Sequence, residues 1–202
     1  MSFTALALVL GIVGGIAAGG RLANVTRRPL ELVWLLALSV ALQVVAESLD
    51  IHGSAGLAMV LASYVGLAAF AIANIRFVGM PVVLVGLLCN LVVITANGGM
   101  PVREDAIVAA GAATRDEIRT LEFGAKRHLE DRTDVVTFLG DIVPVPPTRE
   151  VLSFGDLILA AGVADVIFRL LKPAEPRTRR ERRDRREPAR AAGLRAPQLV
   201  DA

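Results

Sequence analysis

Five long apolar stretches separated by polar segments dominate the pattern of the chain. They cover residues 3–20, 30–46, 55–75, 78–96 and 154–171. Each has 17 to 21 residues, and about 20 helical residues are needed to cross a hydrocarbon core of about 30 Å. Because backbone amides inside lipid must pair within their own segment, each stretch is predicted to be helical. The pattern therefore predicts an all-α fold, a five-span transmembrane helical bundle.

The polar segments divide this predicted bundle into four parts. We expect a four-helix membrane region at 1–97, an outer helical loop at 98–153, a fifth transmembrane helix at 154–172 and a tail at 173–202. Within the loop, Thr114 and Glu117 have the spacing of a capping box, which predicts a helix over 115–131. A shorter helix is expected over 104–113.

A short apolar segment at 135–143 interrupts the polar loop. It is too short to cross a bilayer, so we expect it to lie in the membrane interface or to re-enter the membrane. The following stretch opens with Ser153 and Asp156, which again have capping-box spacing. This second box predicts where the last helix begins.

Charge is distributed unevenly along the chain, although the formal net charge is only +2. Residues 1–99 contain four Arg and three acidic residues, and the other 18 basic and 17 acidic residues follow. A soluble globular enzyme does not leave half its length so nearly uncharged, and this class is excluded. The segment 21–29 carries three Arg and no acid, whereas 47–54 carries two acids and no base. The positive-inside rule then places the N-terminus outside a cell membrane and the C-terminus in the cytoplasm.

The tail at 173–202 contains nine Arg and five acidic residues. Seven of the Arg lie between residues 177 and 186, where almost nothing apolar accompanies them, so we expect this segment to be disordered or at most a transient helix. Its charge could act as a cytoplasmic stop-transfer anchor that fixes the topology or could bind anionic lipid at the inner face, and both stay open. It lacks the aromatic residues or folded reader typical of nucleic-acid binding, so no nucleic acid is expected.

Small residues indicate where helices approach one another closely. Gly11, Gly15 and Gly19 recur every four residues in the first apolar stretch. Such spacing is typical of close helix contact in membranes. The contact could be within the chain or could form a homo-oligomer, and the sequence leaves both open.

Six polar residues are expected to gather at the outer leaflet: Gln43, Asn90, Asn97, His128, Asp141 and Asp156. Polar groups within membranes bridge helices or mark functional sites. Asp141 and Asp156 are also candidate catalytic residues, because two carboxylates can share a proton and divide the roles of acid and base.

Other chemistry finds little support in the sequence. No P-loop, dinucleotide fingerprint or nucleophile motif is present, so no cofactor is expected. A metal site could be drawn from Glu47, Asp50, His52 and His128, but the pattern is not specific and no metal is expected. The single cysteine, Cys89, excludes a disulfide within the chain.

Four short motifs occur in a fixed order between residues 97 and 156. They are Asn97-Gly98-Gly99-Met100-Pro101, Lys126-Arg127-His128, Leu139-Gly140-Asp141-Ile142-x-Pro144 and Ser153-Phe154-Gly155-Asp156. Together with Asn90 and Thr133, this order resembles a family of bacterial multi-pass membrane proteins known only as a domain of unknown function. The resemblance covers about residues 1–172. It implies a bacterial membrane protein and implies no particular reaction.

Three functions therefore stay open at this point. The first is a non-enzymatic integral membrane protein, a binding or accessory component with a polar site at the outer leaflet. The second is an aspartyl-type membrane hydrolase that uses Asp141 and Asp156. The third is a subunit of a small-solute transporter, although no span carries a chain of ionisable groups. We favour the first, and whether the protein is an enzyme is left open.

Overall fold

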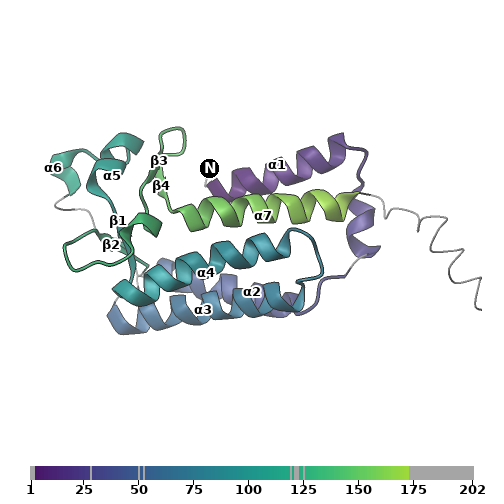
Figure 1. Ribbon diagram of the computed structural model, residues 1–202, viewed down its shortest axis with the longest axis horizontal. Coiled ribbons are helices and arrows are strands. Elements are labelled where there is room, and N and C mark those ends of the chain that lie inside the picture. The colour runs from purple at the N-terminus through teal and green to yellow at the C-terminus, as the bar shows by residue number, and fades with distance from the viewer. Residues whose placement is uncertain are drawn as a thin grey trace, which may run out of the picture. The chain divides into compact units, whose positions relative to one another are not determined.

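Five long helices form where the apolar stretches lie in the sequence (Figure 1). The computed structural model describes residues 3–172 except positions 28, 50, 52, 119, 121, 122 and 125. The helices are α1 (Phe3–Ala17), α2 (Val33–Ser48), α3 (Gly53–Ala73), α4 (Met80–Asn97) and α7 (Phe154–Leu171). Two predictions concern residues outside this described part of the chain: the tail at 173–202 with its lipid contact, and the possible metal ligands Asp50 and His52.

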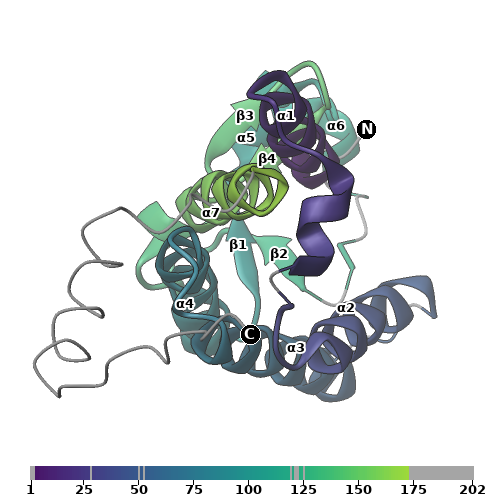
Figure 2. The ribbon, with the colours of Figure 1, turned by 90° about the vertical axis from the view of Figure 1, so that its right-hand side faces the viewer.

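Viewed along their axes, the long helices form a curved row in the order α1, α7, α4, α3, α2 (Figure 2). A short 3-10 helix, η1 (Leu22–Arg27), connects α1 to α2 and packs against the last turn of α7. There the Asn24 side chain donates a hydrogen bond of 2.8 Å to the carbonyl of Leu171. The bond satisfies one of the carbonyls that a helix end leaves without a partner.

Glycines bring α4 and α7 into backbone contact. A side chain at Gly86 would lie 2.6 Å from the backbone nitrogen of Leu159, and one at Gly162 would lie 2.6 Å from that of Val83. On the other side of α7, a side chain at Gly11 of α1 would lie 2.9 Å from the carbonyl oxygen of Ala164. Only residues without a side chain permit such approaches, so these glycines set the spacing of three helices.

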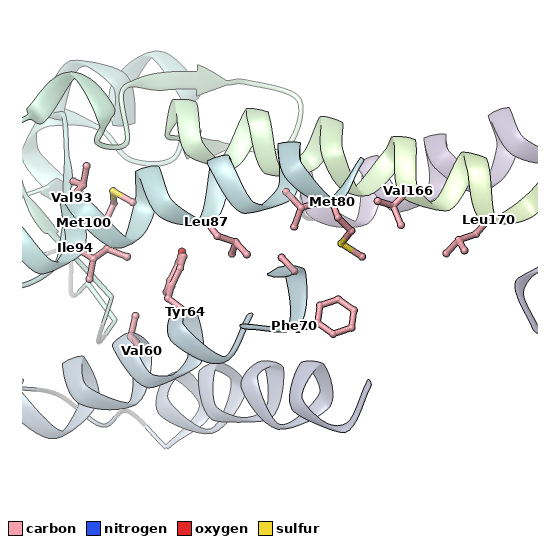
Figure 3. Packing of buried hydrophobic residues seen from close by; sticks show 12 residues of the cluster. Val60, Tyr64, Phe70, Met80, Leu87, Val93, Ile94, Met100, Val166 and Leu170 are labelled. Atoms are coloured by element: carbon pink, nitrogen blue, oxygen red, sulfur yellow. The ribbon is translucent and has the colours of Figure 1, made fainter. Parts of the chain in front are cut away.

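The main hydrophobic core lies between α3, α4 and α7 (Figure 3). Its largest fully buried members include Ile94 of α4 and Met100, which follows that helix. Tyr64 points from α3 toward α4 and is only 3% exposed (Figure 3). The core therefore continues from the helices into the region that follows α4.

The region 98–153 lies at one end of the helices and contains short strands as well as helices (Figure 1). Strand β1 (Met100–Val102) pairs in parallel with β2 (Arg127–Leu129), and β3 (Val143–Val145) pairs antiparallel with β4 (Glu150–Leu152). Its helices are α5 (Glu104–Ala110), α6 (Arg115–Ile118) and the 3-10 helix η2 (Thr137–Leu139). A second, smaller core holds it together, formed by Val102, Ala106, Ile107, Ala110, Ile118 and Val151.

The prediction of five membrane-spanning helices is wrong. Among the described residues only α3 and α4 are long and apolar enough to cross a membrane, by length and composition, and a buried helix of a soluble core can pass the same test. Helices α1 and α2 have 15 and 16 residues, because the apolar stretches also include loop positions such as Gly19, whose φ is +82°. Helix α7 is long enough but carries Asp156, Asp165 and Arg169.

The all-α expectation is also wrong, because region 98–153 contains strands. The helix expected over 115–131 is reduced to the four residues of α6. Half of the predicted capping box forms: the Thr114 amide donates to the Glu117 carboxylate at 2.8 Å. The Thr114 hydroxyl donates to the same carboxylate rather than accepting from the Glu117 amide, and only one turn of helix follows. Further along, the Met100 amide donates to the Lys126 carbonyl at 2.7 Å, which draws this part of the chain into a parallel pair with β1.

Candidate functional site

Asn90 is the centre of a buried hydrogen-bonded cluster where α3, α4 and α7 meet region 98–153. Its side chain is fully buried. Its Nδ2 donates to Oδ1 of Asp156 at 2.7 Å and, over a longer 3.5 Å, to the Tyr64 hydroxyl. Its Oδ1 accepts a hydrogen bond of 2.9 Å from the Ser153 hydroxyl. One amide therefore joins three helices.

The start of α7 positions two of these partners. The Ser153 hydroxyl accepts from the Asp156 amide at 2.9 Å, and Oδ2 of Asp156 accepts from the Ser153 amide at 3.3 Å, so the predicted capping box is confirmed. Gly155 between them leaves room for Asn90, because a side chain there would overlap its Oδ1. The motif Ser153-x-Gly155-Asp156 therefore builds a docking point for an amide of α4.

Two neighbouring cations approach this cluster from the start of β2. The ammonium of Lys126 lies over the Tyr64 ring, 5.4 Å from its centre. Burial tends to lower the pKa of Lys126, but Tyr64 and Asp156 outweigh it and raise that pKa. For Arg127, burial likewise opposes the charge, and Asp141 with Asp156 raises the pKa above its usual value. Both side chains are therefore held as cations.

Asp141 is the most deeply buried carboxylate of the site. Its side chain is 1% exposed, and the Nε of Arg127 lies 2.8 Å from Oδ2. Within the described chain, neither carboxylate oxygen receives a well-directed hydrogen bond. Burial raises the pKa of Asp141 to about 6, although the charge of Arg127 acts in the opposite direction. We call Tyr64, Asn90, Lys126, Arg127, Asp141, Ser153 and Asp156 the polar junction.

The backbone of Asp141 ties it to β1. Its amide donates to the Pro101 carbonyl at 2.9 Å, and its carbonyl accepts from the Arg103 amide at 3.0 Å. The residue therefore extends the β1–β2 pair as an isolated bridge opposite Val102. Asp141 therefore joins β1 through its backbone and the first residue of β2 through its carboxylate.

The two candidate catalytic acids, Asp141 and Asp156, have different polar partners. Aspartyl dyads share one proton directly between two carboxylates. Both oxygens of Asp156 accept hydrogen bonds from Asn90 and Ser153, while Asp141 faces Arg127. Among the described side chains, no group of three or more His, Cys, Asp or Glu converges to hold a metal ion. That Asp141 and Asp156 act together as catalytic residues stays a prediction.

The remaining predicted site residues lie in separate contacts. Asn97 binds both backbone groups of Val135, accepting from its amide at 2.8 Å and donating to its carbonyl at 2.9 Å. His128 pairs through Nε2 with Asp134 at 2.9 Å. Gln43 donates to the Ser63 hydroxyl at 2.6 Å and joins α2 to α3. That these residues form one site with Asn90 and Asp156 stays a prediction.

Sequence reasoning missed the roles of Tyr64, Lys126 and Arg127. Two signals point to them in hindsight. Tyr64 is the single tyrosine of the chain and lies within an apolar stretch, and Lys126 with Arg127 is the only adjacent pair of cations between residues 99 and 172. Neither signal names a partner, since the pairing with Asp141 depends on how residues 98–153 fold.

The glycines expected to form a contact face are used within the chain in two of three cases. Gly11 and Gly15 of α1 pack against α7, where side chains would meet Ala164 and Leu171. At Gly19 a side chain would meet nothing within 4 Å. A homo-oligomer through this face stays a prediction that a single chain does not test.

Taken together, the fold and site define a class: an apolar helical assembly whose one end is closed by a small mixed region through a buried polar junction. The chain belongs to a family of unknown function (DUF5317), whose sequence profile matches residues 27–168. The match includes all of the polar junction and leaves out α1. No curated protein and no solved structure is detectably similar to the chain.

Proposed function

We propose that the protein is an integral membrane protein without catalytic activity, an accessory component that holds region 98–153 at the outer surface of a cell membrane. In this proposal the hairpin of α3 and α4 crosses the bilayer. The polar junction fixes the orientation of region 98–153 on that hairpin. The apolar side chains of α1 and α2 face the same lipid.

The observation that carries the proposal is the uneven distribution of exposed apolar side chains. Among the described residues, 29 large apolar side chains are exposed, and 25 of them precede residue 93. They include Trp34 at 64% and Leu10 at 59%. So much apolar surface on helices is typical of contact with lipid or with partner proteins. Region 98–153 has an enclosed core of its own and a charged exterior, as expected of a part that faces water.

The orientation follows from which ends of the helices carry basic residues. The backbone amide of Arg21 bonds to the Leu171 carbonyl at 2.9 Å, so the Arg-containing connection between α1 and α2 lies at the same end as Lys172. The connection between α3 and α4 carries Arg76, which pairs with Glu31 at 2.7 Å near the start of α2. Basic residues favour the cytoplasmic side, which supports our proposal that region 98–153 faces outward.

A non-enzymatic role agrees with the chemistry of the polar junction. Asn90, Ser153 and Asp156 satisfy one another, so they do not present free groups to a substrate. Asp141, the remaining carboxylate, lies with both oxygens out of reach of solvent. A general acid or base must reach the proton that it transfers. We therefore favour the non-enzymatic role over the hydrolase alternative, although Asp141 has a raised pKa and Asp156 contributes to that rise.

Membrane extraction tests the proposal. The full chain, expressed in a bacterial host, should stay in the membrane pellet after alkaline carbonate treatment and dissolve only with detergent. Replacing Leu88 and Val92 on the exposed side of α4 by Lys should move it to the soluble fraction or to inclusion bodies, since charges near a bilayer centre are costly. The matched control places Lys at Asp116 and Thr120, exposed positions of region 98–153. Release of the wild-type chain by carbonate would contradict the proposal.

A further inference from the structure

Region 98–153 exposes large apolar side chains at one place only among its described residues. Val135, Val136 and Phe138 are exposed to 51%, 36% and 61%. The other described large aliphatic and aromatic side chains of the region are buried or half-buried. We call residues 135–138 the apolar tip. Three such side chains within four residues form a patch, whereas single exposed apolar residues are ordinary.

The backbone holds the apolar tip in a defined shape. Val136 has a left-handed φ of 56°, a conformation that a β-branched residue adopts only when its surroundings impose it. The turn η2 follows, with the Gly140 amide donating to the Thr137 carbonyl at 2.9 Å. Leu139 packs against the main core. The chain therefore directs Leu139 inward while Phe138 stays exposed.

Asn97 fixes the level of the apolar tip along the helices. Its side chain holds both backbone groups of Val135, with distances of 2.8 Å and 2.9 Å. Asn97 is the last residue of α4, one of the two helices that can cross a membrane. The exposed apolar side of α4 includes Val85, Leu88 and Val92. Val92 lies five residues before Asn97, which is about 7.5 Å along a helix. A segment bound to the end of a membrane-spanning helix lies at the depth where hydrocarbon meets water.

We propose that the apolar tip inserts into the outer interface of the lipid bilayer and anchors region 98–153 to the membrane surface. This inference rests on the proposed function. Lipid is the occupant favoured here because the tip is clamped at the level where the apolar surface of α4 ends. Aromatic and aliphatic side chains at this depth contact acyl chains beneath the headgroups. Asp131, Arg132 and Thr133 beside the tip are exposed and would face the headgroups and water.

Fluorescence quenching by brominated lipid tests this inference, because the chain contains a single tryptophan. Trp34 of α2 is exposed and reports on whether the helices contact lipid. In a Trp34→Phe background, Phe138→Trp reports on the apolar tip, and Val135→Trp serves as a second variant there. Asp116→Trp on α6 is the matched control for region 98–153. Each full chain is placed in phosphatidylcholine vesicles with bromine near the glycerol end of the acyl chains.

The expected result is that Trp at position 138 or 135 is quenched at least as strongly as Trp34 in the wild-type chain, while Trp at position 116 is not quenched. Quenching of Trp34 together with equal, weak signals at positions 138, 135 and 116 would overturn the inference and would indicate that the apolar tip faces a second copy or another protein. Absence of quenching at Trp34 itself would instead contradict the proposed membrane location of the helices. The two failures are therefore distinguishable.

Discussion

On the scale of one residue, burial of the Asp141 carboxylate makes its ionised form less favourable. Its side chain is 1% exposed and pairs with the Nε of Arg127 at 2.8 Å. The folded state therefore favours the neutral acid more than the unfolded chain does. The pKa of Asp141 rises from 3.8 to about 6 on folding. Between these two pH values the folded protein binds more protons than the unfolded chain.

The first prediction concerns Asp141→Asn. Because the folded pKa is the higher one, the free energy of unfolding should fall as the pH rises through the window from about 4 to about 6, by up to roughly 3 kcal/mol. Asparagine cannot ionise, so the variant should lack this loss. The measurement is thermal unfolding of both chains in a mild detergent, followed by circular dichroism from about pH 4 to pH 8.

The comparison of the two chains isolates Asp141. Thr133 and Thr114 hydrogen bonds hold the pKa values of Asp131 and Glu117 below their usual range, and these groups destabilise the fold as the pH falls. They are the same in both chains and cancel in the difference. Parallel pH profiles of the wild type and the variant would contradict this account of Asp141.

Local residue patterns could be predicted from the sequence, whereas contacts across the fold could not. The capping box of Ser153 and Asp156 needs only a spacing of three residues, and it is confirmed. The pairing of Asp141 with Arg127 joins positions 14 residues apart through the path of β1 and β2. No periodicity in the sequence specifies that path.

On the scale of elements, glycines allow the backbones of α4 and α7 to come into direct contact. Gly86 and Gly155 lie against each other, since a side chain at Gly86 would be 2.7 Å from the Gly155 carbonyl oxygen. This approach also brings Asn90 to the first turn of α7. Backbone contact and the polar junction therefore depend on the same glycines.

The second prediction is that Gly155→Ala destabilises the protein by about 1–3 kcal/mol, because the new methyl group overlaps Oδ1 of Asn90 and forces the helices apart. The matched control is Gly14→Ala on α1, where the nearest atom to a new side chain is 3.6 Å away on Phe168. That change should be neutral or stabilising by up to about 1 kcal/mol through helix propensity. Thermal unfolding of both variants in detergent is the measurement. Equal stability of the two variants would mean that α4 and α7 are not in such close contact.

The secondary structure of region 98–153 differs most from what the sequence pattern predicts. A capping box at Thr114 and Glu117 indicates where a helix begins but not how long it is. The helix ends after Ile118, whose side chain is buried in the local core with Val102. The strands that follow have three residues each, too few for a pattern of alternating apolar residues to be recognised.

On the scale of the whole molecule, the five apolar stretches correctly predicted five long helices but not which of them can cross a membrane. Hydropathy does not show where a helix ends. Gly19 and Leu32 both have left-handed backbone conformations, so α1 and α2 stop short of the apolar residues around them. Helix α7 is long enough, but Asp156, Asp165 and Arg169 make it more polar than α3 and α4.

The most direct test of the central claim is the sidedness of two single cysteines around the α3–α4 hairpin. Cys89 is replaced by Ser, and a cysteine is placed either at Asp116 on α6 or at Arg76 between α3 and α4, both exposed. Intact cells of a bacterial host are then treated with a maleimide that does not cross membranes. We predict labelling of Asp116→Cys in intact cells and labelling of Arg76→Cys only after the membrane is permeabilised. Labelling of both on the same side would contradict the account, because the hairpin would then not cross the bilayer.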